Sequence, residues 1–276
     1  MPELPEVETT RRGLLPHLVG ATIIDVTVRD SRLRWPIPAG LKKRMVSRVI
    51  HDVTRRGKYL LWDVASTDGG GFLLCHLGMS GSLFATTAKV APVKHDHVDI
   101  LLNLNQTLIR YHDPRRFGAM LWIDGATPTH PLLDHLGPEP LSDDFDGAHL
   151  FTLSRKRAVS VKEFIMNAQV MVGVGNIYAS EALFGAGIRP TIAAGRISRA
   201  RYDLLAAAIR QTLTNAIAAG GSSLRDYVKA DGEPGYFQLA TMVYDRADAP
   251  CRICNTIIKM IRQGQRSTYF CPRCQH

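Results

Sequence analysis

The chain has 276 residues, of which 45% are hydrophobic and 21% are charged, a composition typical of a folded protein with about two domains. Its 23 glycines and 15 prolines follow no repeat, which excludes a collagen-like fibre, and no apolar run approaches the roughly 18 residues of a membrane span. The net charge is +9, with +1 on residues 1–145 and +8 on residues 146–276, and such a basic half favours a polyanion partner such as nucleic acid.

The first predicted element is an amphipathic helix over residues 7–18, where apolar residues recur three, four and seven positions apart before Gly20. Glu3, Glu6 and Glu8 stand where a secretion signal would be basic and then apolar, so we expect a cytoplasmic protein. Glu6 lies near the predicted helix start, where a carboxylate also interacts favourably with the helix dipole.

Short β-rich runs follow up to residue 123. Ile24, Val26 and Val28 alternate with polar residues, which indicates a half-buried strand. Further strands are expected at residues 58–64, 71–77, 98–102, 107–112 and 119–123. Several short strands at this spacing predict a β-sandwich. Cys75 lies in one of these apolar runs, and we expect it to be a buried packing thiol.

A segment rich in Pro, Asp and Gly over residues 126–147 indicates a linker, and helical patterns follow it. Residues 198–219 carry an apolar side chain every four residues, before two glycines that end the helix. Another helix is expected to begin after Gly173-Val-Gly-Asn176, with Asn176 as its N-cap. A helix N-terminus also binds phosphate, and the spacing alone does not decide between the two roles.

Four of the five cysteines lie close to the end of the chain, as Cys251-Arg-Ile-Cys254 and Cys271-Pro-Arg-Cys274. Two such pairs predict a zinc ribbon, because each knuckle directs two thiolates toward one tetrahedral ion. A pair of disulfides is the alternative, but a cytoplasmic chain disfavours it. Four cysteine ligands leave no open coordination position, so we expect one structural Zn²⁺.

Residues 256–261 and 267–270, between the two cysteine pairs, are β-type and flank a Gly-containing turn, which predicts a hairpin. Arg262 and Arg266 lie at its tip. A basic hairpin held by metal suits insertion along a nucleic acid groove, whereas a solvated loop is the alternative.

The opening Met1-Pro-Glu-Leu-Pro-Glu-Val-Glu-Thr9 resembles the start of the bacterial formamidopyrimidine-DNA glycosylases, also called 8-oxoguanine DNA glycosylases. Further blocks follow in the family's order, at residues 56–59, 76–81, 94–99, 113–118, 173–178, 234–237 and 265–268, and the four cysteines close the series. The resemblance therefore covers the whole chain.

The resemblance implies an α+β multidomain fold. Its parts are an N-terminal β-sandwich over residues 1–125, a linker over 126–147, a helix–two-turns–helix DNA-binding domain over 148–235 and a zinc finger over 236–276. It also implies one structural Zn²⁺, damaged double-stranded DNA as partner, and a monomer that binds no membrane.

The implied activity is that of a bifunctional DNA glycosylase and abasic-site lyase of base excision repair, which excises 8-oxoguanine and formamidopyrimidines. Removal of Met1 would expose the secondary amine of Pro2, and an α-amino group, with pKa about 8 against about 10.4 for lysine, supplies more of the neutral nucleophile. By resemblance Pro2 forms a Schiff base with the sugar, which allows β,δ-elimination of the strand. Glu3 and Lys58 would carry protons, and Arg266 would contact phosphate and assist the second elimination.

The resemblance also implies DNA-binding residues on both halves of the chain. They are His95, Arg115, Arg157, Lys162 and Asn176. A base inside a duplex must be rotated out before it reacts, and the vacated stack must be filled. Met79, Arg115 and Phe117 match the void-filling residues, whereas core packing is the alternative for Met79 and Phe117.

The chain departs from the family pattern at three positions. Asn167 replaces an aspartate, and Asp245 and Asp248 replace glycines, which adds negative charge near the base of the finger. Two other functions remain open: an endonuclease VIII-type enzyme that prefers oxidised pyrimidines, and a zinc-ribbon DNA-binding protein without catalysis. Lesion preference is expected to depend on residues 220–238.

Overall fold

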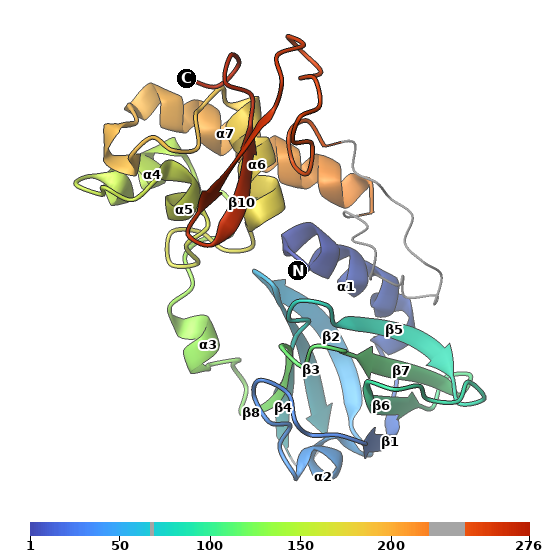
Figure 1. Cartoon of the computed structure of the whole chain (residues 1–276). Coiled ribbons are helices and arrows are strands. Elements are labelled where there is room, and N and C mark those ends of the chain that lie inside the picture. The colour runs from blue at the N-terminus through green and yellow to red at the C-terminus, as the bar shows by residue number, and fades with distance from the viewer. Residues whose placement is uncertain (67–68, 221–240) are drawn as a thin grey trace. The chain divides into compact units, whose positions relative to one another are not determined.

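The computed structural model describes residues 1–66, 69–220 and 241–276, which belong to two compact units (Figure 1). The first unit contains Met1–Asp134, and the second contains His135–Ala219 and the described residues of the C-terminal segment. The block at 234–237 and most of the 220–238 segment lie outside the described residues. Within the described ranges, no helix combines the length and the apolar character of a membrane span.

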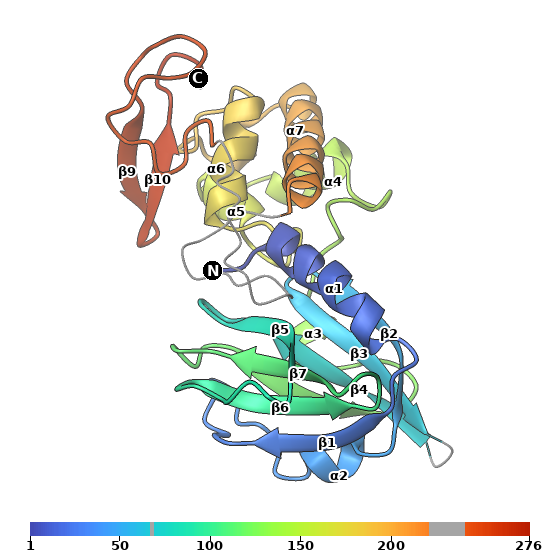
Figure 2. The same cartoon turned by 90° about the vertical axis from the view of Figure 1, so that its right-hand side faces the viewer.

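The first unit is built on two four-stranded antiparallel sheets, which confirms the predicted β-sandwich (Figure 2). One sheet has the order β1-β6-β7-β5, with bounds Ile23–Val28, Asp96–Leu102, Thr107–His112 and Ser82–Thr87. The other has the order β2-β3-β4-β8, with bounds Val49–Arg56, Tyr59–Ser66, Gly69–His76 and Ala119–Asp124. Trp62 and Tyr111 are fully buried members of the core that both sheets share.

Helix α1 (Leu4–Leu18) packs on β2, β3 and β5, and it begins three residues before the predicted start. The predicted pattern of apolar spacing starts only at Val7, but a capping box between Glu3 and Glu6 starts the helix earlier. Glu6 therefore has the structural role expected of a carboxylate at the start of this helix, because it accepts from the Glu3 N–H. This unit also contains two short helices, α2 (Leu41–Met45) and α3 (Pro131–Asp134). Helix α3 lies within the segment that was predicted to be a linker.

Strand β1 differs from the predicted alternation. Ile24 was expected to share the buried face with Val26, but it is 49% exposed because the pairing of β1 with β6 shifts register between Ile23 and Asp25. Such an irregularity reverses the inward and outward positions on one side of it. The polar strand β2 and the short strand β5 were not predicted, since neither has strong alternation.

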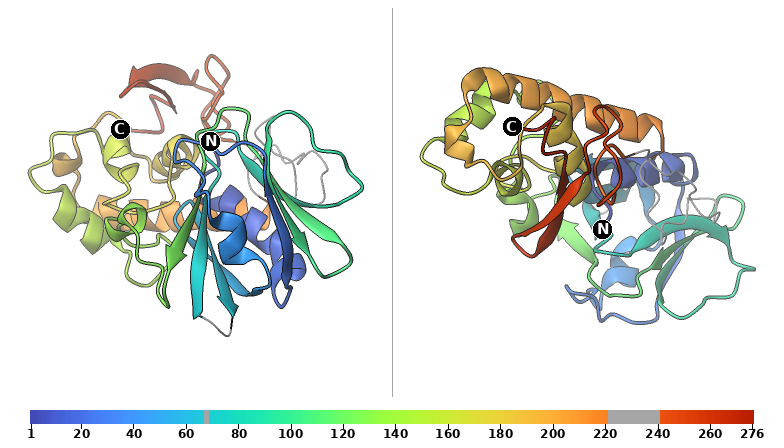
Figure 3. Two further views of the ribbon diagram at one scale, coloured as in Figure 1. Left: turned by 90° about the horizontal axis from the view of Figure 1, so that it is seen from below. Right: turned by 45° about the horizontal axis from the view of Figure 1, so that its top comes forward.

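The second unit contains helices α4 (Gly147–Ser154), α5 (Val161–Ile165), α6 (Asn176–Gly185) and α7 (Arg199–Ala218), with a 3₁₀ turn at Ala194–Arg196 (Figure 3, left). The side chains of Asp146, Ser160 and Ser198 cap α4, α5 and α7. The predicted N-cap role of Asn176 is wrong: Gly175 occupies the cap, and Asn176 is the first helical residue.

The predicted C-terminal hairpin is present as β9 (Lys259–Gln263) and β10 (Arg266–Phe270) (Figure 3, right). Gly264 and Gln265 join the strands with φ of 48° and 62°, as in a type I′ turn, which matches the twist of paired strands. The first strand begins three residues later than expected and ends two residues later, because Thr256 and Ile258 bond to Cys251 and Ala249 at the first cysteine knuckle.

Candidate active site and nucleic-acid interface

Pro2 and Glu3 are buried at the N-terminal end of α1. Glu3 is the N-cap residue, and its N–H donates to Glu6 Oε2 at 2.8 Å. Both carboxylates are only 2% exposed. The capping box thus fixes the direction in which the chain enters the helix, and with it the position of Pro2.

The charged groups predicted for the active site act on the same chain end. Burial lowers the pKa of the Met1 α-amino group; Glu3 and Glu6 oppose this, whereas Lys58 and Arg115 lower the pKa further. Met1 and Arg115, which follows β7, also line one cavity, so the loop after β7 lies beside the chain end. A buried amine with a lowered pKa is more often neutral.

Lys58 lies in the two-residue turn between β2 and β3, next to Gly57. Arg55 donates to the Gly57 carbonyl at 2.9 Å and forms an ion pair of 3.2 Å with Glu8 on α1. Glu8 also accepts from Arg11 and Arg12. Helix α1 therefore holds the turn that presents Lys58. This role of Glu8 was not predicted, because its partner Arg55 lies 47 residues further along the chain.

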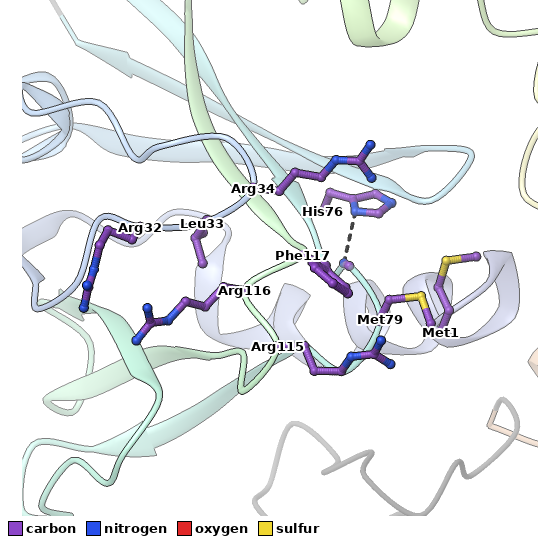
Figure 4. Close-up of a pocket in the computed structure, with 10 residues that line it drawn as sticks. Met1, Arg32, Leu33, Arg34, His76, Met79, Arg115, Arg116 and Phe117 are labelled. Carbon is purple, nitrogen blue, oxygen red and sulfur yellow. Dashed lines mark hydrogen bonds between the residues drawn. The ribbon is translucent and has the colours of Figure 1, made fainter.

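A cavity of about 510 Å³ adjoins the N-terminus within the first unit (Figure 4). Its lining residues are Met1, Arg32, Leu33, Arg34, His76, Gly78, Met79, Arg115, Arg116 and Phe117. Met79 is 37% exposed and Phe117 is 45% exposed, so neither side chain belongs to the core. The Arg115 guanidinium lies 5.0 Å from the centroid of the Phe117 ring. The three residues predicted to fill a vacated stack therefore line one cavity, with mixed apolar and cationic walls.

His76, for which no role was predicted, also lines this cavity. Burial, with the charges of Lys58 and Arg34, lowers its pKa to about 4, so the imidazole is neutral at pH 7. Its Nδ1 lies 3.0 Å from the Gly78 N–H and accepts from it. The proton of the neutral ring is therefore on Nε2, which makes His76 a hydrogen-bond donor.

His95 lies just before β6, half-buried, with φ of 77°. Desolvation and the charge of Lys94 lower its pKa, which favours the neutral ring. Its ring centroid lies 6.2 Å from that of His112. A non-glycine residue in the left-handed region is uncommon, and such conformations occur more often at functional sites.

Lys162 and Asn176 occupy the second unit, where they contact the hairpin. Lys162 is 1% exposed, and its Nζ donates to Asn176 Oδ1 at 2.6 Å, Thr268 Oγ1 at 2.7 Å and the Ser267 carbonyl at 3.2 Å. Asn176 Nδ2 also donates to the Ser267 carbonyl, at 3.0 Å. The pair ties α5 and α6 to β10. A phosphate contact by Lys162 stays a prediction, and it requires the ammonium to exchange one of these acceptors.

Arg266 and Arg157 are exposed on the second unit. Arg266 follows the hairpin turn and lines a cavity of about 270 Å³, together with Lys162, Glu163, Met166, Asn167, Gln263 and Gly264. A side chain in place of Gly264 would lie 2.6 Å from Glu163 Oε1, so the turn approaches α5 closely. Asn167, which stands where the family pattern has an aspartate, thus lines the same cavity as Arg266.

The four C-terminal cysteines form the metal site that their spacing predicts. Their Sγ atoms all lie within 4.8 Å of one another, and none forms a disulfide. Zn–S bonds of about 2.3 Å give a tetrahedron with edges of about 3.8 Å. The Cys251–Cys274, Cys254–Cys271 and Cys254–Cys274 separations of 3.9, 3.5 and 3.4 Å fit such an ion.

The base of the finger is held by Glu181 of α6, which accepts from the N–H groups of Met242, Val243 and Tyr244 at 2.8–3.0 Å. The two aspartates that replace glycines follow this segment, with φ of 57° at residue 245 and 63° at residue 248. Glycine adopts this region without strain, and aspartate tolerates it better than most residues.

Comparison with known protein families covers most of the chain. Residues 1–120 match the formamidopyrimidine-DNA glycosylase N-terminal domain, residues 136–228 match the formamidopyrimidine-DNA glycosylase H2TH domain, and residues 249–276 match a zinc finger found in FPG and IleRS. The third match supports the assignment of one structural zinc to the four cysteines.

Individual relatives match over their full length. The chain is 54% identical to the formamidopyrimidine-DNA glycosylase of Methylococcus capsulatus and 57% identical to that of Thiobacillus denitrificans, each over 275 residues that cover 100% of both chains. The MutM (Fpg) protein of Thermus thermophilus is 39% identical, with a TM-score of 0.85 over 99% of this chain and 98% of that one. A Lactococcus lactis FPG mutant in complex with Fapy-dG-containing DNA is 32% identical, with a TM-score of 0.89 over 100% of both chains. The chain thus belongs to the formamidopyrimidine-DNA glycosylase family.

Proposed function

We propose that the protein is a bifunctional DNA glycosylase and abasic-site lyase that removes oxidised purines, 8-oxoguanine and formamidopyrimidines, during base excision repair. The observation that carries the proposal is the buried position of Pro2 beside Glu3, at a chain end where the charges of Glu6, Lys58 and Arg115 act on the Met1 amine that precedes it. Among solved structures with the same fold, one holds Fapy-dG-containing DNA and another holds DNA with carbocyclic 8-oxo-G. The matching purine lesions favour this activity over one directed at oxidised pyrimidines.

The proposed reaction begins when Met1 has been removed and the Pro2 nitrogen is free. Its lone pair attacks C1′ of the damaged nucleotide, and the bond from C1′ to the base breaks with its electron pair on the base, which takes up the proton that the Pro2 nitrogen loses. Glu3 protonates the sugar ring oxygen, and ring opening gives an iminium between Pro2 and C1′. The iminium accepts electrons when a proton leaves C2′, so the 3′ phosphate departs, and loss of a proton from C4′ in a second elimination releases the 5′ phosphate.

Lys58 and Arg266 have separate roles in the proposal. Lys58 transfers protons near the amine, where its charge already acts. Arg266 binds the phosphate that leaves in the second elimination, for which an exposed guanidinium after a rigid turn is suitable. Arg157 and Asn176 bind backbone phosphates, and the zinc supplies only the folded structure of the hairpin.

The exposed Met79 and Phe117 side chains enter the stack after the base leaves it, and Arg115 donates to the unpaired partner base. Their exposure supports this role over core packing. His95 and His76 donate to the DNA backbone as neutral imidazoles. We further propose that the protein acts as a monomer in the bacterial cytoplasm, on nucleoid DNA.

Borohydride trapping tests the central step. Incubation with abasic-site DNA and borohydride should link the chain covalently to the strand, because the reductant converts the iminium to a stable amine. A zinc-ribbon protein without catalysis would give no linked product. Faster excision of an oxidised pyrimidine than of 8-oxoguanine would instead favour the endonuclease VIII type.

The variant Pro2→Gly examines the nucleophile itself. It keeps a primary amine at the chain end after Met1 removal, but it should lose most base excision while lesion DNA still binds. Excision rates in single turnover and binding titrations provide the measurement. Normal excision by the variant would contradict the proline mechanism.

A further inference from the structure

Asp113 follows β7 directly and is fully buried. Its Oδ1 accepts from Ser80 Oγ and from the Arg115 N–H, each at 3.3 Å. Its Oδ2 accepts from the Gly118 N–H at 2.9 Å and from the Tyr111 hydroxyl at 3.3 Å. Four donors from three parts of the chain therefore meet at one carboxylate.

The backbone of Asp113 reaches a further segment. Its N–H donates to the His95 carbonyl at 3.1 Å, and its carbonyl accepts from His97 Nε2 at 2.8 Å. Because His97 is 1% exposed, this bond lies inside the unit. Asp113 thus contacts three segments: the Met79 loop (residues 77–81), the Phe117 loop (residues 113–118) and the segment that carries His95.

The Met79 loop and the Phe117 loop also touch through their backbones. Gly78 has φ of +64°, and a Cβ at this position would lie 2.5 Å from the Phe117 carbonyl carbon and from the Gly118 nitrogen. A displacement of one loop must therefore move the other. Met79 directly follows Gly78, and Phe117 directly precedes Gly118, so the backbone segments that carry these two exposed side chains lie against each other.

The chemistry of the cluster requires a carboxylate. Each oxygen of Asp113 accepts from one backbone N–H, which can only donate, and an ionised aspartate accepts at both oxygens. The Tyr111 hydroxyl lies 3.3 Å from both Asp113 Oδ2 and the His76 carbonyl, so these two acceptors share its proton. Burial raises the pKa of Tyr111, and the nearby charge of Asp113 raises it further, so the phenol keeps its proton. An asparagine would direct an NH₂ group at one side of the cluster and leave the backbone N–H on that side, of Arg115 or of Gly118, without its acceptor.

We propose that Asp113 is a positioning residue that holds Met79, Arg115 and Phe117 together for entry into the DNA stack and keeps His95 in place beside them. The inference rests on the proposed function, in which the first three residues fill the vacated stack. Extrusion of a base costs a few kcal/mol, and only side chains already held in place can offset that cost as the base leaves.

The test compares Asp113→Asn with Asp99→Asn. Asp99 is also a buried carboxylate of this unit, but it binds Arg110 and Arg29 rather than the two loops. For each variant, single-turnover excision of 8-oxoguanine from duplex DNA is compared with cleavage of a preformed abasic site. Fluorescence of 2-aminopurine beside the lesion reports the unstacking step.

Asp113→Asn should slow excision about tenfold or more, and slow the fluorescence change equally, while abasic-site cleavage stays within about twofold of the parent. Asp99→Asn should change both rates in parallel with its folded fraction. Parallel losses in Asp113→Asn, or normal excision, would overturn the inference.

Phe117→Ala separates this inference from the proposed function. If Phe117→Ala leaves the ratio of the two rates unchanged, the void-filling role itself is wrong. If it slows excision selectively and Asp113→Asn does not, only the positioning role of Asp113 fails. In the double variant, Asp113→Asn should add less than about twofold, because its effect passes through Phe117.

If Asp113→Asn does not fold, the variant Ser80→Ala tests the positioning role of Asp113 instead. It removes the one side-chain bond between Asp113 and the Met79 loop from a half-buried position. It should slow excision selectively by about threefold. Unchanged rates for both substrates would then exclude the proposed link between the loops.

Discussion

At the scale of single residues, Glu8 shows how a charge outside the proposed chemistry can support it. Burial raises the pKa of Glu8, but hydrogen bonds from Arg11 and Arg12 and the charge of Arg55 outweigh that effect and lower it to about 2. The carboxylate is thus ionised over the whole physiological range, and it anchors the arginine that holds the turn before Lys58.

A pH-dependent stability difference follows for Glu8→Gln. Because the folded pKa lies below the ordinary value of 4.5, the contribution of Glu8 is fully present above pH 4.5 and is lost as the pH falls toward about 2. At pH 7 the variant should be less stable by up to about 3 kcal/mol. Urea unfolding from pH 7 to pH 3 measures both proteins, and a difference that does not shrink below pH 4.5 would contradict this account.

At the scale of elements, the hairpin depends on two kinds of support. The cysteines share a small core with Phe184, Val243 and Ile258, and Lys162 binds β10 from the helical side. This core is too small to order the segment alone, whereas structural zinc contributes folding free energy directly. The position of Arg266 therefore depends on the metal as well as on the turn.

Cys254→Ser should release the zinc, unfold the hairpin and weaken DNA binding by about tenfold or more. Atomic absorption should find one zinc per parent chain and almost none in the variant. Cys75→Ala, a change in the core of the first unit, should keep its zinc and serves as the matched control. Full activity of the metal-free protein would show that the hairpin has no part in the reaction.

At the scale of the whole molecule, charge is distributed unevenly along the sequence, with most of the excess after residue 145. Each DNA phosphate that a protein cation neutralises releases counterions. The slope of log K against log salt is therefore proportional to the number of phosphate contacts. Arg157→Ala should weaken binding to any duplex and reduce the slope of log K against log salt by about 0.9. Arg199→Ala, whose guanidinium is paired with Asp203 at 3.0 Å, should leave the slope almost unchanged. Equal slopes for the parent protein and both variants would show that Arg157 does not contact a DNA phosphate.

Much of this architecture could be predicted because it depends on local patterns. The cysteine spacing indicated the metal site, and the alternation of short apolar runs indicated the sandwich. The position of Asp113 at the junction of three segments could not be predicted from the sequence, because Ser80 and Gly118 approach it only after the sheets have formed. The exposure of Ile24 depends in the same way on a register shift between strands far apart in sequence. The N-cap error at Asn176 arose because its side chain binds Lys162 and β10, which local propensity does not register.

The five cysteines divide into two groups, and the reactivity of each group with alkylating reagents reports the unfolding of a different part of the chain. Cys75 is fully buried in the first unit, where burial raises its pKa, while the other four belong to the finger. Thiolates are the species that alkylating reagents modify, and metal protects them. A chelator should therefore expose four sites to iodoacetamide, and the fifth should react only when the β-sandwich melts. Intact-mass spectra would then count the two events separately in one sample, and early labelling of Cys75 would reveal that the units do not unfold independently.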